Sequence, residues 1–166
     1  RYIENVSFNN FSIIAQGGGT VSDGEIRTIP ELRHIRIGTG TQQIIPAYGI
    51  YVRHVKGLYM DNMLMNTATP DDRPAVICNE VVDMVFSDSK ASVTSDAECM
   101  IRLQNVQQAW IRNCQPFGSN NTFLKIEGEK SRGILLSGND LRKFKNSFSF
   151  INGATKDAVT ETNNIY

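Results

Sequence analysis

Apolar positions recur along the chain at an interval of about 25 residues. The anchors of this repeat are Phe8, Met60, Phe86, Ile111 and Leu136, separated by 52, 26, 25 and 25 residues. The first interval therefore holds two periods. Apolar residues also stand two places before every anchor: Val6, Leu58, Met84, Ala109 and Ile134. A repeat of this length is typical of a solenoid, in which each unit stacks on the next.

Each unit predicts two short strands and a tight turn. One strand ends at the anchor, and the other carries apolar residues ten and eight places before it. The ten-before positions are Ile50, Val76, Ile101 and Ile126. Side chains alternate along a strand, so each apolar pair lies on one face. Two places after the anchors stand Asn10, Asn62, Asp88, Asn113 and Gly138, residue types that favour tight turns. Stacked Asn side chains there would form an amide ladder.

A leucine-rich repeat and a parallel β-helix both fit this period. A leucine-rich repeat usually needs a helix in its return segment, which Pro70 and Pro74 disfavour. We therefore predict an all-β fold, a right-handed parallel β-helix (solenoid) of about 25 residues per coil, as one domain over 1–166. Residues 16–46 interrupt the repeat as a loop excursion with a strand or helical turn near 31–37. The register fades after Leu136, and 152–166 are predicted to be a tail or cap.

Charge and cysteine content exclude several classes of function. Lys plus Arg and Asp plus Glu both number 17, which argues against nucleic-acid binding because that needs clustered positive charge. No apolar run reaches the roughly 18 residues of a membrane span. The three cysteines, Cys78, Cys99 and Cys114, lack CxxC spacing. They predict buried free thiols, with no metal site, disulfide framework or cofactor.

Four stretches resemble the C-terminal part of polygalacturonase-like glycoside hydrolases of family 28, within the pectin lyase-like β-helix superfamily. They are residues 3–19, 45–63, 70–76 and 127–141. The resemblance implies a secreted protein, extracellular or periplasmic, that acts in polysaccharide degradation on a uronic-acid-containing substrate such as pectin.

The catalytic signatures of that family are absent. These enzymes carry Asn-Thr-Asp, Asp-Asp, Gly-His-Gly and Arg-Ile-Lys on consecutive coils, for inverting hydrolysis by two carboxyl groups. The only Asp pair here, Asp71-Asp72, lies in a proline-flanked turn without a matching Gly-His-Gly. No catalytic residue is therefore assigned, and whether the protein is an enzyme stays open. One hypothesis is the post-catalytic part of a longer hydrolase that continues upstream. The alternative is a non-catalytic carbohydrate-binding or assembly module, as in tailspikes and adhesins.

Outward positions supply the candidate binding residues. The residues just before the anchors form a stripe that is mostly apolar: Ser7, Tyr59, Val85, Trp110 and Leu135. Tyr59 and Trp110 would stack against sugar rings, unless a loop, the tail or another subunit covers them. On the other sheet Arg53 and Arg102 would pair with uronate carboxylates, or else bridge neighbouring coils. Arg33, His34 and Arg36 form a small basic cluster or an ordinary turn. The open ends of a stack also allow a homo-oligomer.

The missing signatures predict that these 166 residues alone do not hydrolyse polygalacturonate. The test is a reducing-sugar assay with an active polygalacturonase as the positive control. Clear release of reducing ends by the purified chain would contradict the prediction.

Overall fold

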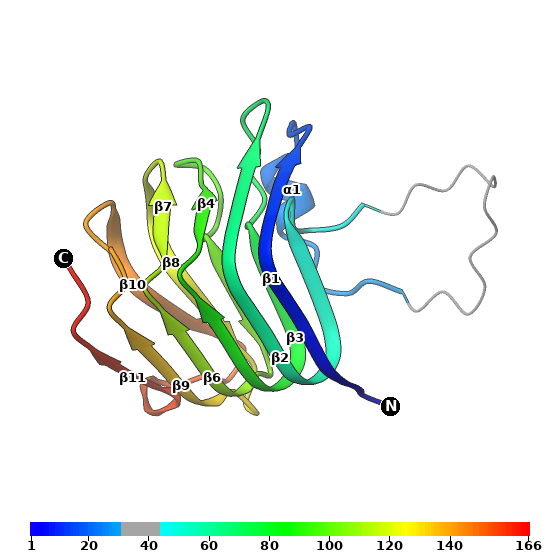
Figure 1. Cartoon of the computed structure of the whole chain (residues 1–166), viewed down its shortest axis with the longest axis vertical. Helices are drawn as coiled ribbons and strands as arrows, with labels where there is room; N and C mark the ends of the chain where they lie inside the picture. The colour runs from blue at the N-terminus through cyan, green and yellow to red at the C-terminus, as the bar shows by residue number, and fades with distance from the viewer. Residues whose placement is uncertain (31–43) are drawn as a thin grey trace.

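The computed structural model describes residues 1–30 and 44–166 and confirms the predicted parallel β-helix (Figure 1). The solenoid has about five turns of about 25 residues each. Its elements are β1 (Ile3–Ala15), α1 (Val21–Gly24), β2 (Ile50–Thr67), β3 (Val76–Ser87), β4 (Lys90–Ser92), β5 (Ile101–Gln104), β6 (Gln107–Arg112), β7 (Gln115–Phe117), β8 (Asn120–Glu127), β9 (Arg132–Ser137), β10 (Phe144–Ile151), the 3-10 helix η1 (Lys156–Ala158) and β11 (Val159–Thr162). Neither α1 nor η1 is long or apolar enough to cross a membrane, and the described residues contain no other helix.

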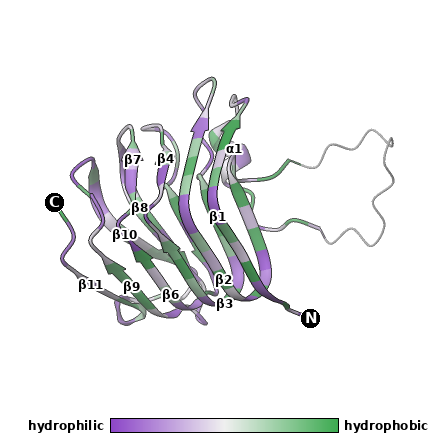
Figure 2. Cartoon of the chain, viewed as in Figure 1, coloured by the Kyte–Doolittle hydropathy of each residue, from purple (hydrophilic) through white to green (hydrophobic). Residues whose placement is uncertain are grey.

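The coils stack through parallel strand pairs that form three faces. The first face joins the start of β2 and of β3 to β5, β8 and β10. The second face joins β1, the middle of β2 and the end of β3 to β6, β9 and β11. The third face joins the ends of β1 and β2 to β4 and β7. Hydrophobic and hydrophilic residues alternate along the strands (Figure 2), so one set of side chains fills the interior.

The predicted anchor column is confirmed on the second face. Phe8 pairs with Met60, Met60 with Phe86, Phe86 with Ile111, and Ile111 with Leu136. The last four of these side chains have no exposed surface. Each coil therefore buries its anchor against the coils on either side, which stabilises the stack through apolar contact.

The tight turns after the anchors are also confirmed. Residues two places after the anchors have positive φ, from 51° at Asn62 to 66° at Gly138, a region that Asn, Asp and Gly tolerate. Their side chains form part of the predicted ladder. Asn62 donates to Asn10 at 2.7 Å, and Asn113 donates to Asp88 at 3.0 Å. The turn residues thus tie neighbouring coils together at one corner of the solenoid.

A second, buried polar column beside this corner was not predicted. Ser89 accepts the backbone N–H of Met63 at 3.0 Å, and Asn139 accepts that of Cys114 at 3.0 Å. Asn139 also donates to the Ile111 carbonyl at 3.0 Å. Both side chains are fully buried. They satisfy backbone groups that the bend removes from the ladder.

The predicted register is wrong on the first face for Ile126. It pairs with Leu103, one inward position later than expected, and Leu124 takes the place beside Ile101. The turn between β8 and β9 is longer than the equivalent turn between β5 and β6, so the chain is back in register at β9. The slip places Lys125 beside Arg102 and Glu127 beside Gln104.

The predicted fading of the register after Leu136 is also wrong. In the predicted tail, β11 pairs with β9, with Val159 beside Ile134 and Glu161 beside Leu136. Glu161 occupies the anchor position, and its polarity is tolerated because β11 is the edge strand and the residue is exposed. In the excursion, the predicted strand or helical turn and the cluster of Arg33, His34 and Arg36 lie outside the described residues.

Candidate functional site

The second face presents the predicted stripe to solvent. Tyr59 pairs with Val85, Val85 with Trp110, and Trp110 with Leu135. Tyr59 is 44% exposed and Trp110 is 40% exposed, while Val85 and Leu135 are half-buried. Paired strands lie about 4.8 Å apart, so the stripe runs along the solenoid axis, across the stacked coils. We call these four residues the aromatic stripe.

Polar side chains from the positions after the anchors run beside the aromatic stripe. The guanidinium of Arg112 lies 4.5 Å from the ring centroid of Trp110. The indole N–H of Trp110 donates to the Ser137 hydroxyl at 2.8 Å, and the Ser87 hydroxyl donates to Asp61. These contacts fix the plane of the indole and leave its surroundings polar, as in a site that takes an amphipathic ligand.

The surface is hollowed along the aromatic stripe. One hollow of about 350 Å³ is lined by Tyr59, Asp61, Val85, Ser87 and Arg112, among others. A second of about 260 Å³ is lined by Asp83, Val85, Gln108, Trp110 and Leu135, among others. Val85 borders both hollows, so they lie next to each other on the second face. Their lining mixes apolar rings with carboxylate, hydroxyl and guanidinium groups.

No described loop covers the aromatic stripe. The predicted tail pairs with β9 as one more strand of the second face. Within the described part of the excursion, Gly24 and Ile26 contact the first face through Arg102. The alternative in which the tail hides the aromatic rings is therefore wrong, whereas cover by another subunit is untested.

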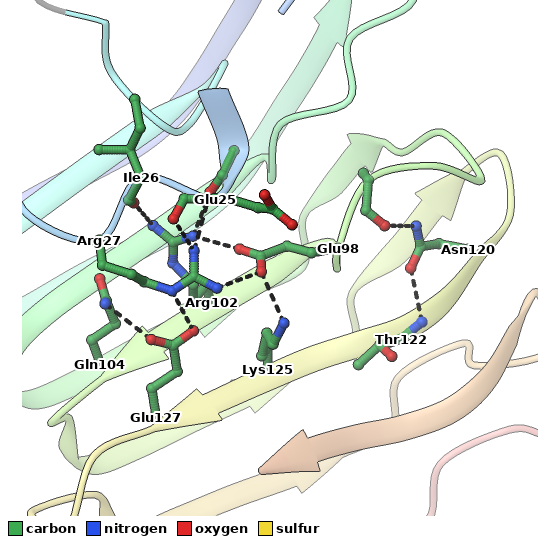
Figure 3. Close-up of polar contacts among 12 residues, drawn as sticks. Glu25, Ile26, Arg27, Glu98, Arg102, Gln104, Asn120, Thr122, Lys125 and Glu127 are labelled. Atoms are coloured by element: carbon green, nitrogen blue, oxygen red, sulfur yellow. Dashed lines mark hydrogen bonds and ion pairs between the residues drawn. The ribbon is translucent and has the colours of Figure 1, made fainter. Parts of the chain in front are cut away.

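The first face is closed by the excursion, and Figure 3 shows the contacts that hold it there. Arg102 has no exposed surface. Its guanidinium donates to the carbonyl of Gly24 at 2.6 Å, to that of Ile26 at 2.8 Å, and to the Glu98 carboxylate. Arg27, in the excursion, forms ion pairs with Glu98 at 2.6 Å and with Glu127 at 3.0 Å.

Glu98 is the centre of this buried ionic cluster. Besides Arg27 and Arg102, Lys125 donates to it at 2.9 Å. Burial alone would raise the pKa of Glu98, but the hydrogen bond from Lys125 and the charge of Arg102 outweigh it and hold that pKa below its ordinary value. Glu127 accepts from Gln104 at 3.1 Å. Both carboxylates are used to hold the excursion against the sheet.

The prediction that Arg102 faces a ligand is therefore wrong. Its outward direction was inferred correctly, but the excursion returns across the face and covers it, and both terminal nitrogens of its guanidinium are hydrogen-bonded there. Arg53, half-buried, likewise donates to the Ile29 carbonyl at 2.5 Å. Of the four candidates, only Tyr59 and Trp110 lie together on an open surface. Sequence reasoning missed Arg112, although its place directly after an anchor put it in the column next to Trp110.

The Asp pair also has a structural role. Asp71 is 2% exposed and forms two hydrogen bonds with the Arg73 guanidinium, at 2.9 and 2.7 Å, and one with the backbone N–H of Gly19 at 3.0 Å. Although its burial opposes this, these bonds hold the pKa of Asp71 below its ordinary value. Asp72 accepts from the Thr94 hydroxyl at 2.7 Å. Both carboxyl groups join the excursion and a neighbouring loop to the coil.

The three cysteines are buried free thiols, as predicted. Burial raises the pKa of Cys78 and of Cys114 to about 12, so neither is a ready nucleophile. Within residues 1–30 and 44–166, no group of three or more His, Cys, Asp or Glu is arranged to hold a metal ion.

Comparison with protein-family models, with curated proteins and with solved structures finds no match to the chain. The resemblance to family 28 hydrolases therefore stays a prediction from four sequence stretches. The geometry of the open second face is thus the basis for assigning a function.

The buried ionic cluster predicts a large stability effect. We expect Arg102→Ala to lower the free energy of unfolding by about 3–5 kcal/mol, because it leaves Glu98 and two carbonyls short of a buried partner. Arg142→Ala is the control, since it breaks an Arg–Asp pair on the exposed surface. Urea unfolding monitored by circular dichroism measures both. Equal stability of the two variants would contradict the role given to Arg102.

Proposed function

We propose that the chain is a carbohydrate-binding β-solenoid whose second face takes a polysaccharide along the aromatic stripe. The observation that carries this proposal is the placement of Tyr59 and Trp110 in one exposed column, two coils apart, with hollows beside them. Exposed aromatic side chains in register are unusual on a solvated surface and are typical of a contact site.

The chemistry of the aromatic stripe suits a sugar. The C–H face of a pyranose ring packs on an aromatic ring, and the neighbouring polar side chains match its hydroxyl groups. Asp61 lies in the same hollow as Tyr59 and supplies carboxylate acceptors, while its neighbour Ser87 donates its hydroxyl to Asp61. Two strand spacings separate the rings, about 10 Å, a span comparable to a disaccharide. The rings would therefore contact alternate sugars of a chain that runs parallel to the solenoid axis.

Arg112 favours an acidic sugar at this surface. Its guanidinium lies over Trp110, and its Nε is buried without a hydrogen-bond partner among the described residues. A uronate carboxylate held by Arg112 would gain a charge-assisted hydrogen bond next to the stacking ring. Because the formal net charge of the chain is zero, such binding relies on this local cation and not on an overall basic field.

The relation to family 28 hydrolases is the second proposal. The parallel β-helix supports it, as do the four resembling stretches, and with it comes a secreted location and a pectin-type substrate. The ion pairs of Asp71, Glu98 and Glu127 give those carboxyl groups structural roles in this chain. A carbohydrate-binding surface on the second face is common to this proposal and to the tailspike-like alternative.

The binding test uses three single variants. We expect Trp110→Ala and Tyr59→Ala each to weaken the binding of oligogalacturonides at least about tenfold, since a central aromatic anchor commonly contributes more than 1 kcal/mol. Phe117→Ala is the matched control, because Phe117 is 41% exposed but lies on the third face. Isothermal titration calorimetry measures the affinities, and circular dichroism checks the fold.

Unchanged affinity in the Trp110 and Tyr59 variants would contradict the proposal. An equal loss in the Phe117 variant would do the same, because it would show that the ligand does not select the second face.

A further inference from the structure

A separate hollow of about 470 Å³ lies at the bend between the third and first faces. Ser119 lines it from the β7–β8 connection, Asn121 from the start of β8, and Ser95 from the preceding coil. Lys143 and Lys145 line it from the start of β10. The hollow shares no residue with those along the aromatic stripe. We call it the basic hollow.

The basic hollow carries more positive than negative charge, and the charge of Lys143 also acts on the nearby Asp140 carboxylate. Arg142 also lines it, but its guanidinium is held by Asp140 through bonds of 2.9 and 2.8 Å. Lys143 and Lys145 are exposed, and neither ammonium forms an ion pair with a carboxylate of the described residues. No Asp or Glu lines the hollow itself. Two lysine charges are thus available to a ligand.

The walls of the basic hollow are rigidly held. Asn120, 6% exposed, donates to the carbonyls of Thr94 at 2.7 Å and Ala97 at 2.6 Å. The ring of Phe144 packs edge-on against that of Phe123, with centroids 5.2 Å apart. These contacts fix the positions of the β8 and β10 starts relative to the preceding coil. A ligand would therefore meet a surface that needs little ordering on binding.

We propose that the basic hollow binds the acidic group of a saccharide, a carboxylate or a sulfate ester. Lysine ammonium groups attract oxyanions, and the hydroxyls of Ser95 and Ser119 and the amide of Asn121 match the neutral hydroxyls of a sugar. The volume lies in the range of roughly 300–1,000 Å³ found for small-ligand sites. Two free cations are too few for a nucleic-acid backbone, which engages many phosphates along its length.

The test is an NMR titration of the full chain. The backbone amides of Ser119, Asn121, Lys143 and Lys145 report the basic hollow, and the Trp110 indole reports the aromatic stripe. Four probes are compared: oligogalacturonate, its neutral methyl ester, a heparin oligosaccharide and a single-stranded DNA oligonucleotide. Because the two sites have separate reporters, failure of one proposal is distinguishable from failure of the other.

The variants isolate the two lysines. We expect the double variant K143Q/K145Q to bind the acidic saccharide at the hollow at least about tenfold more weakly, since it removes two charge-assisted contacts. The control K130Q/K156Q removes the same charge from exposed lysines elsewhere and should bind as the unaltered chain does.

Shifts at the hollow with oligogalacturonate or with heparin, absent with the methyl ester, support the proposal. Tighter binding of heparin than of oligogalacturonate would show that sulfate groups add to the recognition of carboxylates. Three results overturn it: no shift at the hollow with either acidic saccharide, equal losses in the two double variants, or equally tight binding of the DNA.

Discussion

The in-register parallel stacking of coils is the constraint on which the rest of the structure depends. Each strand pairs with the equivalent strand of the next coil, so residues about 25 apart become neighbours in space. This pairing collects the anchors into a core and the turn residues into a ladder. By the same rule it gathers Tyr59, Val85, Trp110 and Leu135, which no local sequence feature connects, into one outward column.

The outward residues of the first face are covered by the excursion, whereas those of the second face are exposed to solvent. On the first face the excursion folds back, and Arg27, Arg102 and Lys125 neutralise Glu98 and Glu127 beneath it. Removing one member of such a network lowers the free energy of unfolding strongly, so the network holds the excursion in one position. The second face keeps its aromatic rings in solvent instead. That asymmetry directs the functional assignment to the second face.

Period and alternation in the sequence were enough to predict the anchors, the turn ladder and the outward direction of Tyr59 and Trp110. They do not determine the path of the chain between repeats. The connection from β7 into β8 is shorter than the equivalent connection in the preceding coil, which moved Ile126 by one inward position and brought Lys125 beside Arg102. The return of the excursion buried Arg102, and nothing in its own repeat indicates that cover. The sequence pattern did not reveal the last coil, because its anchor position holds the polar Glu161. An edge strand does not need an apolar anchor there.

The central claim is that the second face receives a sugar chain at Trp110, and Trp110 is the only tryptophan of the protein. Its fluorescence therefore reports this surface alone. Titration with oligogalacturonide should give a saturable change in emission, since a stacked sugar displaces water from a ring that is 40% exposed. Emission that stays constant while calorimetry detects binding would place the ligand elsewhere and contradict the account.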